Sequence, residues 1–121
     1  MREFYGEIII TKHAKDRFVQ RWIKLNRERN YINVYKKMCN MIGRSRLIKT
    51  LRKENGEVHE YRENHGCIFV CAREFSKEFW KKDKVTVVTV ELESWYINEK
   101  IRSGVDINLL DLNEYSKAKV G

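Results

Sequence analysis

The spacing of apolar residues changes at Gly43, and this change constrains the fold more than any other feature of the sequence. Before Gly43, apolar side chains recur every three or four residues, which is the period of a helix buried along one face. After Gly43 the period becomes that of strands, in short apolar or alternating runs. The order predicts helices first and then consecutive strands, which form an antiparallel meander with the helices packed on one face.

Two helices are predicted, at about residues 12 to 28 and 31 to 42. Thr11 is expected to cap the start of the first helix, because its hydroxyl can accept a hydrogen bond from an early backbone N–H. Gly43 is expected to cap the end of the second, because glycine readily takes the left-handed conformation found there. Residues 1 to 10 are expected to be extended and to include an edge strand.

Four strands are predicted, at residues 47–53, 57–63, 67–74 and 85–91. Asn55-Gly56 indicates a hairpin with a type I′ turn between the first two strands, and Asn64-His65-Gly66 indicates the next turn. We therefore expect an α+β domain over residues 1–92, with two N-terminal helices packed on a four-stranded antiparallel meander. Residues 93–121 are expected to be a C-terminal extension that is partly helical, from Ser94 to Arg102.

Composition favours a globular protein made in the reducing interior of the cell. A chain of 121 residues with 42% hydrophobic residues can bury a core as one domain. No apolar run is long enough to span a membrane and no secretion signal is visible, so we expect a cytoplasmic protein. The three cysteines are expected to be reduced apolar side chains. No metal site and no cofactor are expected, because the three histidines lack carboxylates at matching spacing and no phosphate loop occurs.

The net charge of +8 is concentrated in the first half of the chain. Residues 1–53 contain fifteen Lys and Arg against four Asp and Glu, or +11, and the remainder contains ten against thirteen, or −3. Such a basic region suits a polyanion, most economically nucleic acid. A basic surface without a ligand, or one that docks an acidic protein, would show the same excess. The candidate nucleic-acid contacts are Lys12, Lys24, Arg44, Arg46, Lys49 and Arg52.

The stretch from Ile10 to Trp22 holds the most promising chemistry. His13, Arg17 and Arg21 are spaced by four residues, so on a helix they form one polar seam beside an apolar stripe. Histidine can accept or donate a proton near neutral pH, and arginine binds phosphate oxygens through two parallel hydrogen bonds. The alternative is that these residues form only the solvated face of a helix.

The segment ITKHAKDRFVQRW, together with KVTVVTVEL at residues 84–92, resembles a group of small bacterial and phage domains with an H-A-x-x-R helix. That group resembles outlying members of the barnase–EndoU–colicin–RelE superfamily of metal-independent ribonucleases, many of which are toxins. The resemblance implies a RelE/barnase-like sheet and an endoribonuclease. It also implies that His13 is the general base or acid and that Arg17 and Arg21 bind the scissile phosphate.

The sheet is expected to supply the remaining catalytic groups. Tyr61 and Thr89 are the candidates, with His59 as an alternative, although Thr89 also suits a strand for its β-branched shape alone. By strand alternation His59, Tyr61 and Glu63 share one face, while Val58, Glu60 and Arg62 share the other. Catalysis requires the arginines and a group from the sheet to converge with His13 in an open basic cleft.

Two further functions suit the same sequence. One is a non-catalytic regulator that binds nucleic acid or a protein partner, such as an antitoxin or a host target. The other is a homo-oligomer held together by the leucine-rich part of the C-terminal extension. The residues that would form that contact are Ile107, Leu109, Leu110 and Leu112.

Overall fold

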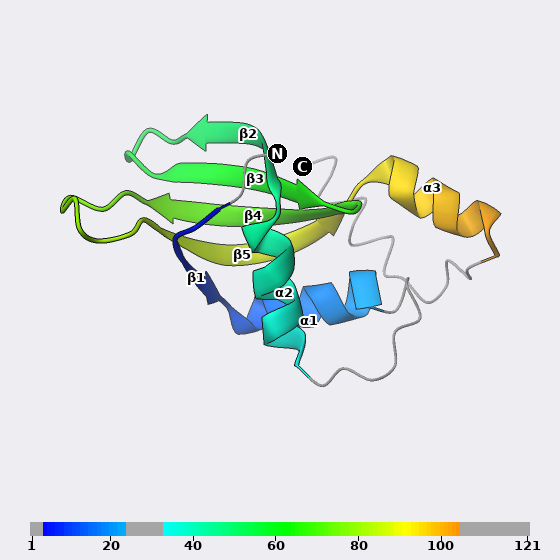
Figure 1. Cartoon of the computed structure of the whole chain (residues 1–121). Coiled ribbons are helices and arrows are strands. Elements are labelled where there is room, and N and C mark those ends of the chain that lie inside the picture. Colours follow the sequence, from blue (N-terminus) through cyan, green and yellow to red (C-terminus); the bar gives the residue numbers. More distant parts are fainter. Residues whose placement is uncertain (1–3, 24–32, 105–121) are drawn as a thin grey trace.

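A computed structural model provides the structure of the chain and describes residues 4–23 and 33–104 (Figure 1). It shows an α+β fold, as predicted. The helices are α1 (Lys12–Phe18), which continues as the π-helix η1 (Val19–Ile23), α2 (Val34–Gly43) and α3 (Ser94–Arg102). The strands are β1 (Glu7–Ile10), β2 (Arg46–Arg52), β3 (Val58–Asn64), β4 (Cys67–Glu74) and β5 (Lys84–Leu92).

The sheet has five strands in the order β1-β5-β4-β3-β2. Strands β2 to β5 form the predicted antiparallel meander. Strand β1 pairs parallel to β5, with Ile8 opposite Val85, so the sheet is mixed and the expectation of four antiparallel strands was incomplete. A parallel pair needs a long connection between its strands. Here residues 11–83 connect β1 to β5. The spacing of apolar residues within one short segment therefore cannot reveal that the two strands pair.

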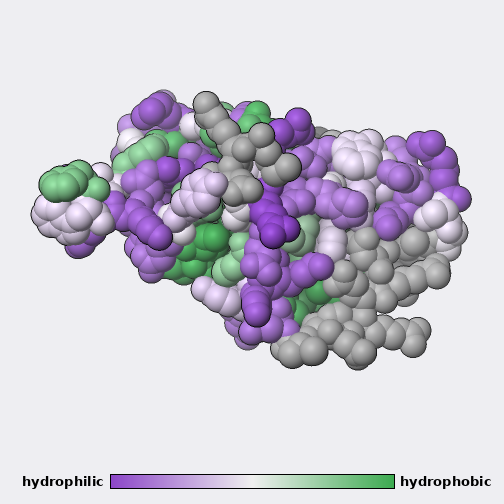
Figure 2. Space-filling model, viewed as in Figure 1, coloured by the Kyte–Doolittle hydropathy of each residue, from purple (hydrophilic) through white to green (hydrophobic). Residues whose placement is uncertain are grey.

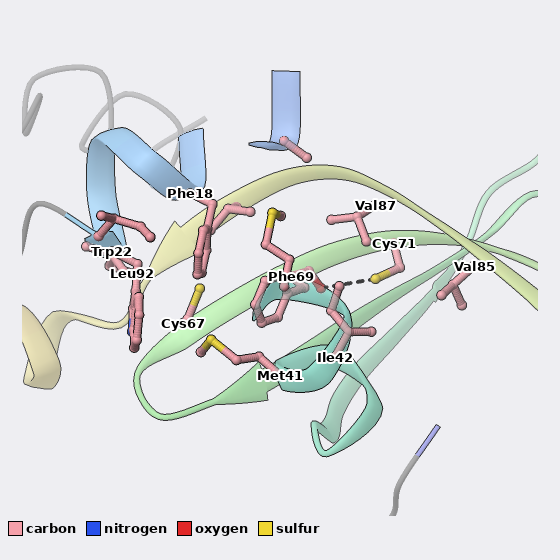
Figure 3. Packing of buried hydrophobic residues seen from close by; sticks show 14 of the residues in the cluster. Phe18, Trp22, Met41, Ile42, Cys67, Phe69, Cys71, Val85, Val87 and Leu92 are labelled. Atoms are coloured by element: carbon pink, nitrogen blue, oxygen red, sulfur yellow. Dashed lines mark hydrogen bonds between the residues drawn. The ribbon is translucent and has the colours of Figure 1, made fainter. Parts of the chain in front are cut away.

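Helices α1 and α2 cover one face of the sheet and enclose the core (Figures 1 and 3). Phe18 is fully buried, and its ring stacks on Trp22 at 5.3 Å and on Phe69 of β4 at 6.1 Å between ring centroids. From α2, Met38 and Ile42 pack into the same cluster. Burying each such side chain contributes on the order of 1.5–3 kcal/mol, so this face supplies most of the drive to fold.

The helix ends differ in part from the prediction. Thr11 does cap α1, since its Oγ1 accepts a hydrogen bond from the Ala14 N–H at 3.1 Å. The regular helix ends at Phe18 and continues as η1, and residues 24–28 lie outside the described part of the chain. Gly43 is the last residue of α2 rather than its cap, a role that Arg44 takes with a negative φ. The Gly43 carbonyl instead accepts a hydrogen bond from the Phe4 N–H, which holds the N-terminal segment in place.

The predicted turn at Asn64-His65-Gly66 is present, whereas the turn type of the first hairpin differs from the prediction. Strands β2 and β3 do form a hairpin, but only Gly56 has a positive φ, so its turn is not type I′. The Lys53 N–H donates to the Glu57 carbonyl at 2.8 Å, so three residues lie in the loop instead of the two that a type I′ hairpin requires. Positive φ at both central residues, which type I′ requires, occurs instead at His65 and Gly66 between β3 and β4.

The predicted helix at Ser94–Arg102 is present as α3, and Gly104 follows it with a positive φ. Tyr96 and Ile97 of α3 pack into the same core as α1 and α2. Among the residues that the structure describes, no helix combines the length and apolar character needed to cross a membrane.

Candidate functional site

His13 and Arg17 lie on the outer side of α1. His13 is exposed, and Arg17 is partly exposed with its Nη1 donating to the Gln20 Oε1 at 3.1 Å. Lys12 and Lys15 are exposed on the same helix. A phosphate could therefore reach this helix from solvent.

Arg21 does not continue this exposed seam. Its side chain is 4% exposed, and its Nη1 donates to the Val90 carbonyl of β5 at 2.5 Å. Strand β1 ends opposite Val87, so in the described chain no strand pairs with β5 beyond that point on this edge. Thr11 binds the Val87 carbonyl through its N–H and its hydroxyl, and Arg21 binds the carbonyl further along. The environment of Arg21 is thus that of a structural contact.

Tyr61 and Thr89 lie on the face of the sheet that points away from α1 and α2. In β3, the alternate residues Glu60 and Arg62 are buried on the helix side, so Tyr61 points to the opposite side. There the Lys49 ammonium lies 5.5 Å from the centre of the Tyr61 ring. Thr89 pairs with Val70 on the same far face. The sheet therefore separates both residues from His13, and the five predicted catalytic residues do not converge.

The other histidines do not supply the missing partner. His59 lies on the far face beside Glu57, 3.4 Å from its carboxylate. His65 occupies the turn before β4, where its ring contacts the rings of Tyr96 and Trp22 edge-on. Within residues 4–23 and 33–104, no group of three histidine, cysteine or acidic side chains could hold a metal ion.

The predicted nucleic-acid contacts are distributed over two surfaces. Lys12 is exposed on α1 and Arg44 is exposed at the end of α2, whereas Lys24 lies outside the described residues. The others, Arg46, Lys49 and Arg52, are exposed on β2, the edge strand.

Further exposed cations on the helices were missed by the sequence analysis. They are Lys15 on α1 and Lys36 and Lys37 on α2. The signal was available, because residues 34–43 contain no acidic residue at all. Figure 2 shows hydrophilic side chains gathered over α2 on this side of the molecule.

A group of charged residues, two buried and two partly buried, was also missed, and we call it the ionic cluster: Glu60, Arg62, Arg73 and Asp83. Glu60 accepts hydrogen bonds from Arg62 Nε at 3.0 Å and from Arg73 Nη1 at 3.2 Å, and Asp83 binds the other end of Arg73. The side chains of Glu60 and Arg62 are only 7% and 6% exposed. Alternation placed Glu60 and Arg62 on one face, but charged residues on a strand normally indicate a solvated face.

The ionic cluster makes a prediction about acid stability. Two groups hold the pKa of the Asp83 carboxyl below its usual range: first the Ser76 backbone N–H and then Arg73. A carboxyl whose pKa is lower in the folded state adds stability above its unfolded-state pKa, and this is lost as the pH falls through the folded-state pKa. We expect Asp83→Asn to reduce the loss in urea midpoint between pH 7 and pH 3. Glu78→Gln is the control, and an equal pH dependence in wild type and Asp83→Asn would contradict the assignment.

Comparisons with models of known protein families, with curated proteins and with solved structures found no match to this chain.

Proposed function

We propose that this protein binds RNA through the outer surface of α1 and α2, which we call the basic helical face. Its exposed cations are Lys12, Lys15, Lys36, Lys37 and Arg44. The observation that carries the proposal is the charge of this layer: across residues 12–23 and 33–44 the only acidic residue is Asp16. Cations gathered without acidic neighbours attract a polyanion, and each phosphate that they neutralise releases counterions.

An aromatic ring in the same surface supports RNA over a smaller anion. Tyr35 lies on α2 beside Lys36, and its side chain is 48% exposed although its hydroxyl donates to the Ile8 carbonyl. That hydrogen bond fixes the ring while leaving part of it open to solvent. An exposed ring among cations is the combination on which unpaired bases stack while the lysines follow the backbone.

The test is a comparison of two charge-reversal variants that change the net charge equally. Lys12→Glu with Lys36→Glu alters the basic helical face, whereas Lys53→Glu with Lys77→Glu alters exposed lysines outside it. We expect the first pair to weaken binding of a single-stranded RNA more than tenfold. We also expect it to flatten the dependence of log Kd on log salt, by about 0.7 for each phosphate that the variant no longer neutralises. We expect the second pair to change the affinity less than threefold. Equal losses of RNA affinity in the two variants would show that only net charge matters, and would refute the proposal that the basic helical face binds RNA.

RNA cleavage is the second candidate function, and the exposure of His13 within the basic helical face favours it. The geometry supports binding more strongly, because Tyr61, His59 and Thr89, the sheet residues predicted to assist His13, lie on the face of the sheet that points away from α1. Incubating end-labelled RNA with the protein in EDTA separates the two functions. Cleavage that disappears in His13→Ala would establish the ribonuclease, and intact RNA with tight binding would establish the binding protein.

A further inference from the structure

A cavity of about 350 Å³ opens beside the ionic cluster, where the segment before β1 crosses β3 and β4. Its lining includes Phe4, Gly6, Arg62, Arg73, Lys82 and Asp83. This volume lies at the lower end of the range of small-ligand sites in proteins. The cavity is built from segments far apart in the sequence, which the fold of the domain holds together.

The arginines of the cavity have hydrogen-bonding capacity that the protein does not use. Arg62 donates only from Nε, to Glu60, and its Nη1 is buried without a hydrogen-bond partner. Arg73 uses Nη1 and Nη2 on Glu60 and Asp83, and its Nε is likewise buried and unpartnered. Leaving a donor unsatisfied on a buried charged group is costly, so such donors mark a place where a ligand or a small shift of a side chain would be favourable.

The charge around the cavity is also out of balance. Arg62, Arg73 and Lys82 carry three positive charges, and Glu60 and Asp83 supply two negative charges, which leaves one positive charge in excess. Lys82 is exposed and makes no ion pair with the described residues. Phe4, only 7% exposed, lies about 5 Å from both guanidinium groups and shields them from water, which strengthens their pull on an anion.

We propose that this cavity binds the phosphate group of a ligand. Phosphate fits better than a carboxylate because its oxygens can face three cationic side chains at once, whereas a carboxylate has only two oxygens. The phosphate would accept a hydrogen bond from the Lys82 ammonium and, after a small shift of the side chain that uncovers the buried Nη1, from Arg62, with Arg73 contributing its charge. The site is independent of the basic helical face, because neither Arg62 nor Lys82 belongs to that surface.

The proposal is tested by adding inorganic phosphate to the full-length protein without RNA and measuring thermal unfolding and titration calorimetry. At matched ionic strength, phosphate is expected to raise the Tm of the wild type more than chloride does, because a ligand that binds only the folded state stabilises it. Lys82→Ala is expected to bind phosphate roughly tenfold more weakly, which is the effect of losing a hydrogen bond from a charged donor. Lys81→Ala is the matched control, since Lys81 is exposed, pairs with Glu78 and does not line the cavity.

Two outcomes would overturn the site: no stabilisation by phosphate beyond that of chloride, or phosphate binding in Lys82→Ala that equals that of Lys81→Ala. Lys82 is exposed, so its replacement leaves the fold intact and the test does not depend on a variant of Arg62 folding. The RNA affinity of Lys82→Ala then identifies the source of the phosphate. A parallel loss of RNA binding points to a phosphate of RNA, and unchanged RNA binding points to a small phosphorylated compound.

Discussion

Replacing Gly66 by alanine is expected to destabilise the protein far more than the same change at Gly56, in the preceding hairpin turn. A Cβ at this position would lie 2.2 Å from Cγ of the Tyr96 ring, and the residue has a φ of +80°. The left-handed conformation and the overlap together are expected to cost about 2 to 5 kcal/mol. The backbone here cannot move away easily, because the Gly66 carbonyl accepts the Glu93 N–H at 2.9 Å and so joins the turn to the start of α3. Urea unfolding followed by circular dichroism measures the change.

Gly56→Ala is the matched control for Gly66→Ala. Gly56 has a similar φ of +87°, but a Cβ there would meet no atom within 4 Å, so only the conformational cost of about 1 to 2 kcal/mol remains. In a Tyr96→Ala background, the cost of Gly66→Ala should fall because the ring is gone, but it should stay above that of Gly56→Ala because the Cβ of residue 96 would still lie 2.6 Å from the new methyl group. Equal costs for the two glycines in the wild type would show that Tyr96 does not pack on the turn as described.

Replacing Glu60 by glutamine is expected to have a comparably large effect on stability. Glu60 is the carboxylate shared by Arg62 and Arg73, and its loss leaves the buried charge of Arg62 without a counter-ion. Removing one partner of a buried ion pair typically costs about 3 to 5 kcal/mol. The free energy of unfolding from urea titration is the measurement, and a destabilisation below about 1 kcal/mol, as for a surface pair, would contradict the burial of the cluster.

Two further variants test whether the loss of stability in Glu60→Gln comes from the burial of the charges. Glu78→Gln breaks the exposed pair with Lys81 and is expected to change stability by about 1 kcal/mol or less. Combining Glu60→Leu with Arg62→Leu should recover much of the stability that Glu60→Gln removes. The reason is that the double change removes both buried charges and leaves Arg73 paired with Asp83.

Local sequence signals predicted the elements formed by neighbouring residues. Thr11 caps its helix through a hydrogen bond three residues away, and the meander β2 to β5 follows from alternation and short turns. The turn types were less predictable. Asn55-Gly56 satisfies the composition of a type I′ turn, yet the two strands pair so that three residues lie between Lys53 and Glu57, and a pattern of two residues does not fix that register.

The candidate site was predicted only in part, because a helical period says which residues lie together but not what they meet. The spacing of His13, Arg17 and Arg21 placed them on one seam, and the structure leaves His13 exposed while Arg21 binds a carbonyl of β5. The surroundings of the candidate catalytic residues on the sheet could not be predicted for the same reason. Alternation put Tyr61 opposite to Arg62 but could not say which of the two would face the helices.

The sequence alone therefore determined the α+β class, the meander, the cap of α1, the helix at Ser94–Arg102 and the basic charge of the first half. Those features depend on interactions within a few residues or on composition. Tertiary structure alone decided that β1 pairs with β5, that the sheet stands between Tyr61 and His13, and that Glu60 and Arg62 are buried. Both faces of β3 carry charged residues, so its pattern does not distinguish a solvated face from a buried one. The partners that neutralise the buried charges, Arg73 and Asp83, come from β4 and from the segment before β5, and only the folded sheet brings them together.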